Sequence, residues 1–150
     1  MPKLIGIAIK HKKRGPMHTL DTAHVGVAGG VDMDFRGKPS KRQVTVISEK
    51  AWQETIAELG VELLWTTRRA NLLVDDINLE NTIGKTINIG ELTLLITQET
   101  DPCERMDEAH AGLFEALRKN WRGGVCCRVI CEGQIKIGDE VQLSDVEINE

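Results

Sequence analysis

The sequence predicts a mainly β protein, a closed antiparallel β-barrel with two or three short helices. Eight short runs have the apolar pattern of strands: residues 3–10, 42–48, 71–74, 85–89, 91–99, 125–131, 134–137 and 140–143. Several of these runs are separated by single glycines: Gly84, Gly90, Gly133 and Gly138. Many short strands joined by glycine turns favour a barrel, because closure leaves no unpaired strand edge.

Two stretches change to the helical period. Apolar residues at i, i+4 and i+7 predict the first helix: Trp52, Ile56 and Leu59. Ser48 is placed to cap its first turn, and Gly60 is placed to end it. A second helix is expected within residues 102–120, where apolar residues lie along one side: Met106, Leu113, Leu117 and Trp121. Gly112 is a candidate break that would divide it in two.

Composition indicates one domain over residues 1–150. The chain is 41% hydrophobic, which is enough to form a core without disulfides. Its net charge of -4 and its aromatic content of 3% argue against nucleic acid or an anionic membrane as partners. Neither a signal peptide nor an apolar run of membrane-spanning length is seen, so we expect a cytoplasmic location.

Cys103 is the cysteine with the clearest chemical setting. Asp101, Pro102 and Glu104 have the order of a helix start, with Asp101 as N-cap and Cys103 at the second helical position. The positive end of the helix dipole and the neighbouring Arg105 would favour the thiolate, which a soft metal or a nucleophilic mechanism requires. The alternative is a small buried residue beside a turn.

The four cysteines form no CxxC or CxxH pair, which argues against a zinc finger, an iron–sulfur cluster or a secreted disulfide framework. Cys126, Cys127 and Cys131 lie within one strand-like run, and we interpret all three as packing residues of the core. His24 and His110 could transfer protons near neutral pH, but scattered histidines are more often surface or core residues.

Three basic segments could bind a phosphate. Residues 36–42 hold four cations before a predicted strand, including Lys41 and Arg42. Arg68 and Arg69 precede another strand, together with Asn71. Residues 121–124, which include Arg122, end in two glycines whose N–H groups could form an anion-binding nest. Each segment could equally be a solvated loop or a tight turn.

The order of these segments resembles the molybdenum cofactor sulfurase C-terminal (MOSC) domain family. The resemblance covers nearly the whole chain from about residue 27 onward. Five segments carry it: RGKPSKRQVTVIS at 36–48, RRANLLVDDINL at 68–79, IGKTINIGELTL at 83–94, PCERM at 102–106, and NWRGGVCCRVICEGQIKIGDEV at 120–141.

The resemblance implies a barrel like that of pyruvate kinase and a site for the molybdenum cofactor (molybdopterin), a pterin with an enedithiolate and a phosphate. By position, Cys103 would be the protein ligand of the metal. Arg69 and Asn71 match a segment that holds the pterin in relatives such as the amidoxime-reducing proteins. Looser cofactor assignments fall on nearby cations: Arg42, Arg122, Arg68 and Lys41. Asp32 or Asp34 stands where relatives often have a Gly-Asp pair and a nearby histidine.

The same resemblance implies an oxidoreductase that reduces N-hydroxylated small molecules, with electrons from a separate reductase. In this hypothesis Cys103 holds the metal, and His110 or Asp107 is the proton donor. The alternative is a carrier without redox chemistry, which stores or delivers the cofactor or carries a persulfide sulfur on Cys103. A third hypothesis is an interaction domain whose basic loops bind an unrelated anion.

Overall fold

The computed structural model describes residues 2–103 and 105–145. Their strands are β1 (Leu4–Ile9), β2 (His18–Thr19), β3 (Thr22–Gly26), β4 (Gly30–Val31), β5 (Val44–Ser48), β6 (Leu72–Val74), β7 (Thr86–Ile89), β8 (Leu92–Glu99), β9 (Val125–Cys131), β10 (Gly133–Lys136) and β11 (Val141–Ser144). Their helices are α1 (Glu49–Leu59), α2 (Met106–Ala109) and α3 (Leu113–Arg118), with short 3₁₀ helices η1 (Trp65–Arg68) and η2 (Lys119–Trp121).

The chain is mainly β with three α-helices in its described residues, but the predicted closed antiparallel barrel is wrong. The larger sheet is open and has eight strands in the order β11-β7-β8-β9-β5-β6-β1-β2, and β10, β3 and β4 form a second sheet. β5 and β6 are parallel, because α1 and η1 form a crossover between them. Between β1 and β11 the structure has one isolated bridge, Lys3 to Glu140, rather than a continuous ladder.

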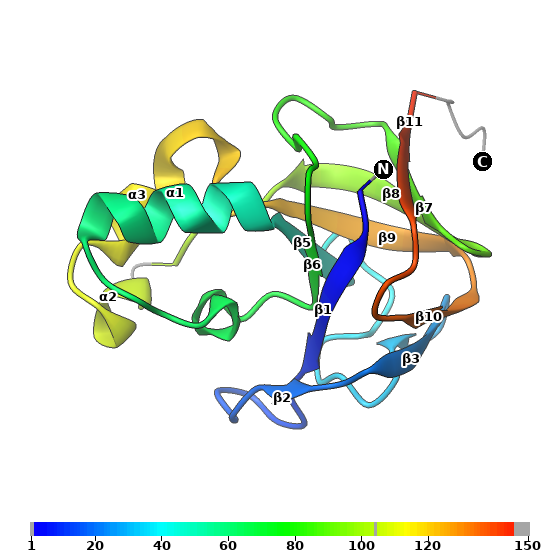
Figure 1. The fold of residues 1–150 in the computed structure, drawn as a ribbon. Coiled ribbons are helices and arrows are strands. Elements are labelled where there is room, and N and C mark those ends of the chain that lie inside the picture. The colour runs from blue at the N-terminus through cyan, green and yellow to red at the C-terminus, as the bar shows by residue number, and fades with distance from the viewer. Residues whose placement is uncertain (1, 104, 146–150) are drawn as a thin grey trace.

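The core has two parts, which follow from the two layers of the fold. The larger part is enclosed by the strands and includes Leu72, Ile87 and Val125. The smaller part lies where the helices cover the sheet and includes Trp52 of α1 and Leu117 of α3. Figure 1 shows the three α-helices together on one side of the sheets. Burial of these apolar side chains is the main favourable term in folding.

Helix α1 forms as the sequence predicts. The Ser48 side chain accepts a hydrogen bond from the Ala51 N–H at 3.3 Å, and Gly60 ends the helix with φ of 68°. Trp52 is buried, and its indole N–H donates to the Leu63 carbonyl at 3.1 Å. The caps and the buried face are both local features, which is why the sequence contains them.

The second helical region starts later than predicted. Gly112, with φ of 89°, separates α2 from α3, so the predicted break is confirmed. The prediction that Asp101 is an N-cap is wrong, because α2 begins at Met106 after Arg105. Thr100, just before the expected helix, donates its N–H to the Gly124 carbonyl at 2.9 Å, and the Met106 N–H donates to the Cys103 carbonyl at 2.8 Å in the turn that leads into α2. The predicted role of Glu104 lies outside the described residues.

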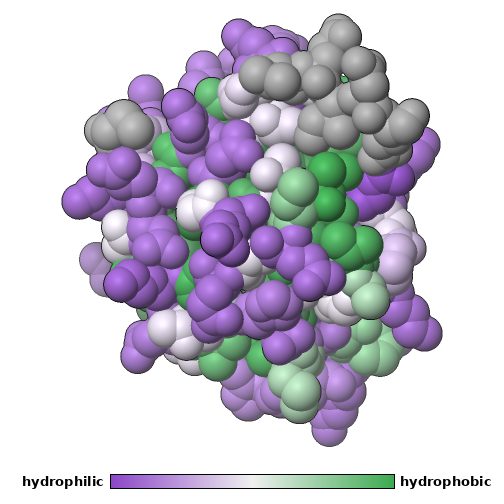
Figure 2. All heavy atoms as spheres, turned by 90° about the vertical axis from the view of Figure 1, so that its right-hand side faces the viewer, coloured by the Kyte–Doolittle hydropathy of each residue, from purple (hydrophilic) through white to green (hydrophobic). Residues whose placement is uncertain are grey.

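The face away from the helices is mostly hydrophilic, and hydrophobic residues gather in one area of it (Figure 2). None of the helices in the described part of the chain has the length and apolar character needed to cross a membrane.

Candidate functional site

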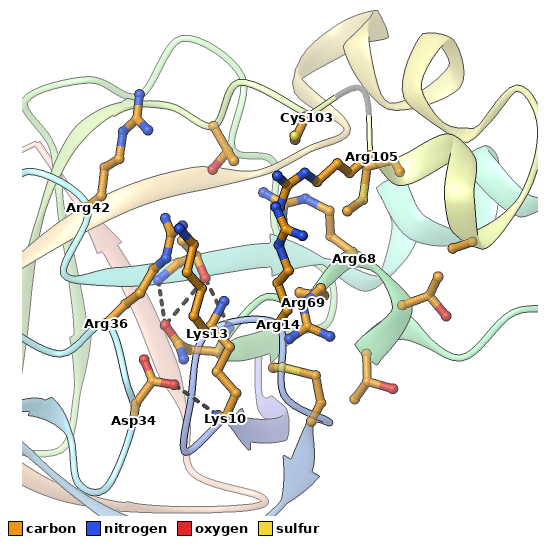
Figure 3. Close-up of a pocket in the computed structure, with 18 of the residues that line it drawn as sticks. Lys10, Lys13, Arg14, Asp34, Arg36, Arg42, Arg68, Arg69, Cys103 and Arg105 are labelled. Atoms are coloured by element: carbon orange, nitrogen blue, oxygen red, sulfur yellow. Dashed lines mark hydrogen bonds between the residues drawn. The ribbon is translucent and has the colours of Figure 1, made fainter.

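A cavity of about 660 Å³ lies among segments that are far apart in the sequence (Figure 3). Its lining comes from residues 10–17, 34–42, 66–71 and 100–109. Single residues of β5 and β9, Thr45 and Cys126, complete the lining. This volume falls in the range of roughly 300–1,000 Å³ that small-molecule sites usually occupy.

The cavity is strongly cationic. Among the described residues, eight basic side chains line it: Lys10, Lys13, Arg14, Arg36, Arg42, Arg68, Arg69 and Arg105. The described acidic residues in the lining are Asp34, Asp101 and Glu108. The whole chain has a net charge of -4, so positive charge is concentrated here against the overall balance. A concave surface of one sign attracts ligands of the opposite sign.

Lys10 shows how closely these cations are placed. Burial lowers the pKa of Lys10, and the positive charges of Arg36 and Arg69 lower it further. Asp34 opposes this effect, and its Oδ1 accepts the Lys10 backbone N–H at 3.0 Å. The charged form of Lys10 is therefore less favourable in the folded protein than in water, and an anion bound here would relieve that cost.

Arg68 is a buried cation in the wall of the cavity. Its Nε and Nη2 both donate to the Gly123 carbonyl, at 3.1 and 2.8 Å. Burial lowers the pKa of Arg68 to about 10, and the nearby Cys126 partly offsets this effect. No carboxylate in the described chain forms an ion pair with Arg68 within 4 Å. The guanidinium is thus fixed in place with its charge uncompensated.

Arg69 and Asn71 both line the cavity, but their side chains also bind within the protein. Arg69 adopts the left-handed conformation at φ of 66°, and its Nη2 donates to the Gly15 carbonyl. Asn71 is buried; its Oδ1 accepts the Thr45 N–H at 3.0 Å, and its Nδ2 donates to the Ala8 carbonyl at 3.1 Å. Asn71 therefore joins β1 to β5, and Arg69 holds the loop after β1 beside the cavity.

Cys103 is exposed, free and part of the cavity lining. It precedes α2 and is not in its first turn, so the predicted position within a helix is wrong. Figure 3 shows the side chains of Arg68, Arg69 and Arg105 gathered near Cys103, while Lys10, Asp34 and Arg36 lie across the cavity. The thiol therefore faces a cationic surrounding that the tertiary fold creates.

The other cysteines differ from one another. Cys127 is in the core, as predicted, and burial raises the pKa of its thiol. Cys126 is also buried, but it lines the cavity, and its Sγ lies 3.5 Å from the Thr100 hydroxyl. Cys131 is exposed near the end of β9, so the prediction that it packs in the core is wrong.

Arg122 lies outside the cavity lining, although the sequence assigned it to the cofactor. Its Nη1 donates to Glu58 of α1 at 3.1 Å. Hydrogen bonds from Lys119 and Arg122 lower the pKa of Glu58. The predicted anion-binding nest does not form, because the Gly123 and Gly124 N–H groups donate to the carbonyls of Leu117 and Trp121.

Lys41, His110 and Asp107 also lie outside the lining. The Lys41 carbonyl accepts a hydrogen bond from the Thr97 hydroxyl, and its side chain is exposed. Asp107 accepts the Phe114 N–H at 2.9 Å and so satisfies a donor at the start of α3. The roles assigned to these three residues stay predictions, and their positions do not support them.

Lys10, Lys13 and Arg14 line the cavity but were not predicted as site residues. The signal was present as the run KHKKR at residues 10–14, directly after the first predicted strand. A basic run in a loop is ordinary on a protein surface, and only the fold shows that this one lines the cavity with Cys103.

Comparison with known proteins identifies the family. Residues 21–142 match the sequence model of the MOSC domain. The chain belongs to the MOSC domain family. This family is associated with binding of the molybdenum cofactor. None of the curated proteins matches the sequence.

Three solved structures have a similar fold. The YuaD protein of Bacillus subtilis aligns with a TM-score of 0.80 and 22% identity, over 95% of this chain and 96% of that one. YiiM of Geobacillus stearothermophilus aligns with a TM-score of 0.75 and 15% identity, over 95% of this chain and 75% of that one. YiiM of Escherichia coli aligns with a TM-score of 0.73 and 14% identity, over 99% of this chain and 72% of that one.

Proposed function

We propose that the cavity of this MOSC domain binds the molybdenum cofactor, with Cys103 as the protein ligand of the metal. One observation carries the proposal: an exposed thiol and eight basic side chains line the same cavity in a chain of net negative charge. A pterin with a phosphate and a thiolate-bound metal needs both a soft sulfur ligand and cations.

The donor set fits a metal that brings ligands of its own. The described residues contain no group of three or more His, Cys, Asp or Glu side chains placed to hold a metal ion. A metal held by Cys103 would need its other ligands from the bound group, and the enedithiolate of the cofactor would provide them. The guanidinium and ammonium groups of the lining suit its phosphate.

The residues of the chain divide into holding and positioning roles. Arg36, Arg42 and Lys10 line the side of the cavity across from Cys103 and would hold the phosphate. Arg69 shares this task while it anchors the loop after β1. Asn71 is a positioning residue, because its amide group is used by backbone partners in β1 and β5.

We further propose that the bound domain reduces N-hydroxylated small molecules, with electrons from a separate reductase. When bound, the cofactor supplies two-electron oxygen-atom transfer. The protein must deliver a proton to the departing oxygen. Asp101 and Glu108 line the cavity on the segment that carries Cys103, whereas Asp107 and His110 do not, so the first two are the proton donors that the geometry favours.

Metal analysis tests the binding proposal. Wild-type protein, Cys103→Ala and Cys131→Ala are produced in a host that makes the cofactor, and molybdenum per chain is measured by mass spectrometry. Cys131→Ala is the matched control, because Cys131 is also exposed and free but lies outside the cavity lining. We expect near one molybdenum in wild type and control and a large loss in Cys103→Ala. Equal molybdenum in all three proteins would refute ligation by Cys103.

The exposed, free thiol of Cys103 also suits a carrier. Molybdenum-loaded protein that reduces no N-hydroxylated substrate with a chemical electron donor would favour storage or delivery of the cofactor. A mass increase of one sulfur atom on Cys103, removed by a reducing agent, would favour the persulfide carrier instead. Turnover of an amidoxime or a hydroxylamine would support the reductase.

A further inference from the structure

We propose that the Cys103 side of the cavity recognises an acidic group, a carboxylate or a phosphate, on the small molecule that reacts there. Substrates of this domain would then be anions. This inference rests on the proposed function for the kind of reaction, but the charge of the ligand is a separate property with its own test.

Arg105 is a cation of the cavity that lies close to Cys103. This residue lies two positions after Cys103 in the sequence, lines the same cavity and is exposed. In the described chain its side chain forms no ion pair within 4 Å. Figure 3 shows it extending toward Arg68 and Arg69 below Cys103. Three guanidinium groups therefore gather where a reacting molecule would meet the thiol.

Cations outside the cavity provide a comparison. Several of them form ion pairs: Lys85 with Asp145, Arg118 with Glu115, and Lys119 and Arg122 with Glu58. The chain has 23 acidic and 19 basic residues, so acidic partners are not scarce. None of the eight described basic residues of the lining forms an ion pair within 4 Å, which leaves their positive charge for a ligand.

The cavity has more cations than one phosphate group needs. A phosphate group takes about one to three charge-assisted hydrogen bonds from basic side chains. Lys10, Arg36 and Arg42 can supply these from across the cavity. The guanidinium group of Arg105, beside Cys103, then remains for a second anion. Because guanidinium is planar and donates in pairs, a carboxylate or a phosphate is the matching group.

Charged alkylating reagents test this inference on the free thiol. The 150-residue chain, produced in a host without the cofactor, is treated with iodoacetate, an anion, or with the neutral iodoacetamide. In both reactions the thiolate forms the S–C bond and iodide leaves, so the ratio of the two rates isolates the effect of reagent charge. The exposed Cys131, outside the cavity, is the internal standard. Mass spectrometry follows both sites in one sample.

We expect the iodoacetate-to-iodoacetamide ratio to be about tenfold higher at Cys103 than at Cys131, since clefts of one sign concentrate oppositely charged molecules by roughly 10-fold or more. The preference should shrink toward the Cys131 value at about 1 M salt, where the screening length falls to about 3 Å. Arg105→Gln should lower the ratio at Cys103. Arg118→Gln removes the same charge from α3 and should leave it unchanged. Equal ratios at the two cysteines overturn the inference.

Molybdenum content separates the two possible sources of the anion. Arg105→Gln that keeps wild-type molybdenum and loses the preference for iodoacetate supports recognition of a substrate group. Arg105→Gln that loses molybdenum assigns Arg105 to the cofactor phosphate and overturns the inference. A wild-type chain that takes up no molybdenum refutes the proposed function, and the alkylation ratio still decides whether this side of the cavity selects anions.

Discussion

At the scale of single residues, the cavity holds charge at the expense of stability. Burial and the charges of Arg36 and Arg69 lower the pKa of Lys10. A base whose pKa is lower in the folded than in the unfolded state reduces the free energy of unfolding, and this cost is largest at neutral pH, where the base is protonated. The cost fades as pH rises through the lowered pKa.

Replacing Lys10 separates this cost from function. We expect Lys10→Met to raise the free energy of unfolding at pH 7, because the methionine keeps the apolar stem and removes the repelled charge. Urea unfolding at pH 7 and at pH 10 measures the effect, which should shrink at the higher pH. Molybdenum content should fall in the same variant. A Lys10→Met variant that is less stable than wild type at pH 7 would show that the charge of Lys10 does not destabilise the fold.

The pKa of Glu99 is shifted in the opposite direction. Burial, and then the charge of Asp101, raise the pKa of Glu99. An acid with a raised folded pKa binds its proton more tightly in the folded state. Its contribution to stability is therefore present at low pH and is lost as pH rises through the raised pKa.

Glu99→Gln should consequently be more stable than wild type at pH 7 and equal to it near pH 4. Thermal unfolding of both proteins across this range measures the difference, with Glu115→Gln on the surface of α3 as the control. A constant difference at all pH values would mean that Glu99 acts through packing and not through its charge.

At the scale of elements, the entry into β9 depends on one glycine. Gly124 has φ of 85°, and a Cβ there would lie 2.2 Å from the Val46 carbonyl oxygen on the neighbouring strand β5. Gly138, between β10 and β11, has a similar φ of 98°, but a Cβ there would meet no atom within 4 Å. The two glycines share a positive φ that disfavours any side chain, and they differ in the steric clash that a Cβ would make.

This pair gives a matched prediction. Gly138→Ala should cost about 1 kcal/mol, the usual cost of a left-handed conformation for a residue with a side chain. Gly124→Ala adds displacement of β5 and should cost more than about 4 kcal/mol, which is exceptional for a single substitution. Chemical denaturation of the two variants measures both values. Similar costs would show that β5 can move without penalty.

Elements whose signals are local could be predicted, and those that depend on distant contacts could not. Ser48 and Gly60 bound α1 with their own side chain and backbone, so the sequence contains both ends. Asp101 looked like a cap, but α2 begins only at Met106, and no local signal at Asp101 shows this later start. The barrel prediction failed because nothing local shows that β5 and β6 pair in parallel.

The residues of the candidate site also fall into those that the sequence predicts and those that only the fold brings together. Cys103 and Arg69 were found from the sequence and its resemblance, and both line the cavity. Arg122 was chosen for its place in a matched segment, but Glu58, far away in sequence, binds its guanidinium. Lys10 and Arg14 were missed because only tertiary structure brings a surface-like basic run to the thiol.

At the scale of the whole molecule, positive charge is concentrated in one cavity of an acidic protein. A ligand that binds only the folded state stabilises it by about 3 kcal/mol at a concentration about a hundredfold above Kd. For a chain of this size, each kcal/mol raises Tm by about 2–4 °C. Anions that bind in the cavity should therefore raise Tm, and anions of higher charge should raise it more.

We expect inorganic phosphate to raise Tm clearly above the value in sodium chloride of the same ionic strength. The double variant Lys10→Met/Arg36→Gln should lose most of this difference. Arg118→Gln/Lys119→Gln, which removes two charges from outside the cavity, should keep it. Differential scanning fluorimetry is sufficient for all three proteins. A phosphate effect no larger than that of chloride would argue against an anion site in the free protein.

The pairing of β5 with β9 also determines when the cavity comes into existence. Val44 pairs with Cys127, so two neighbouring walls come from opposite halves of the chain. Such long-range pairing forms late and slowly compared with local hairpins. During synthesis, the loop after β1 and the segment with Arg69 are made long before Cys103 and Cys126 can join them. The complete cavity therefore exists only once β9 has paired with β5, and a ligand that needs all of its walls can bind only after that step.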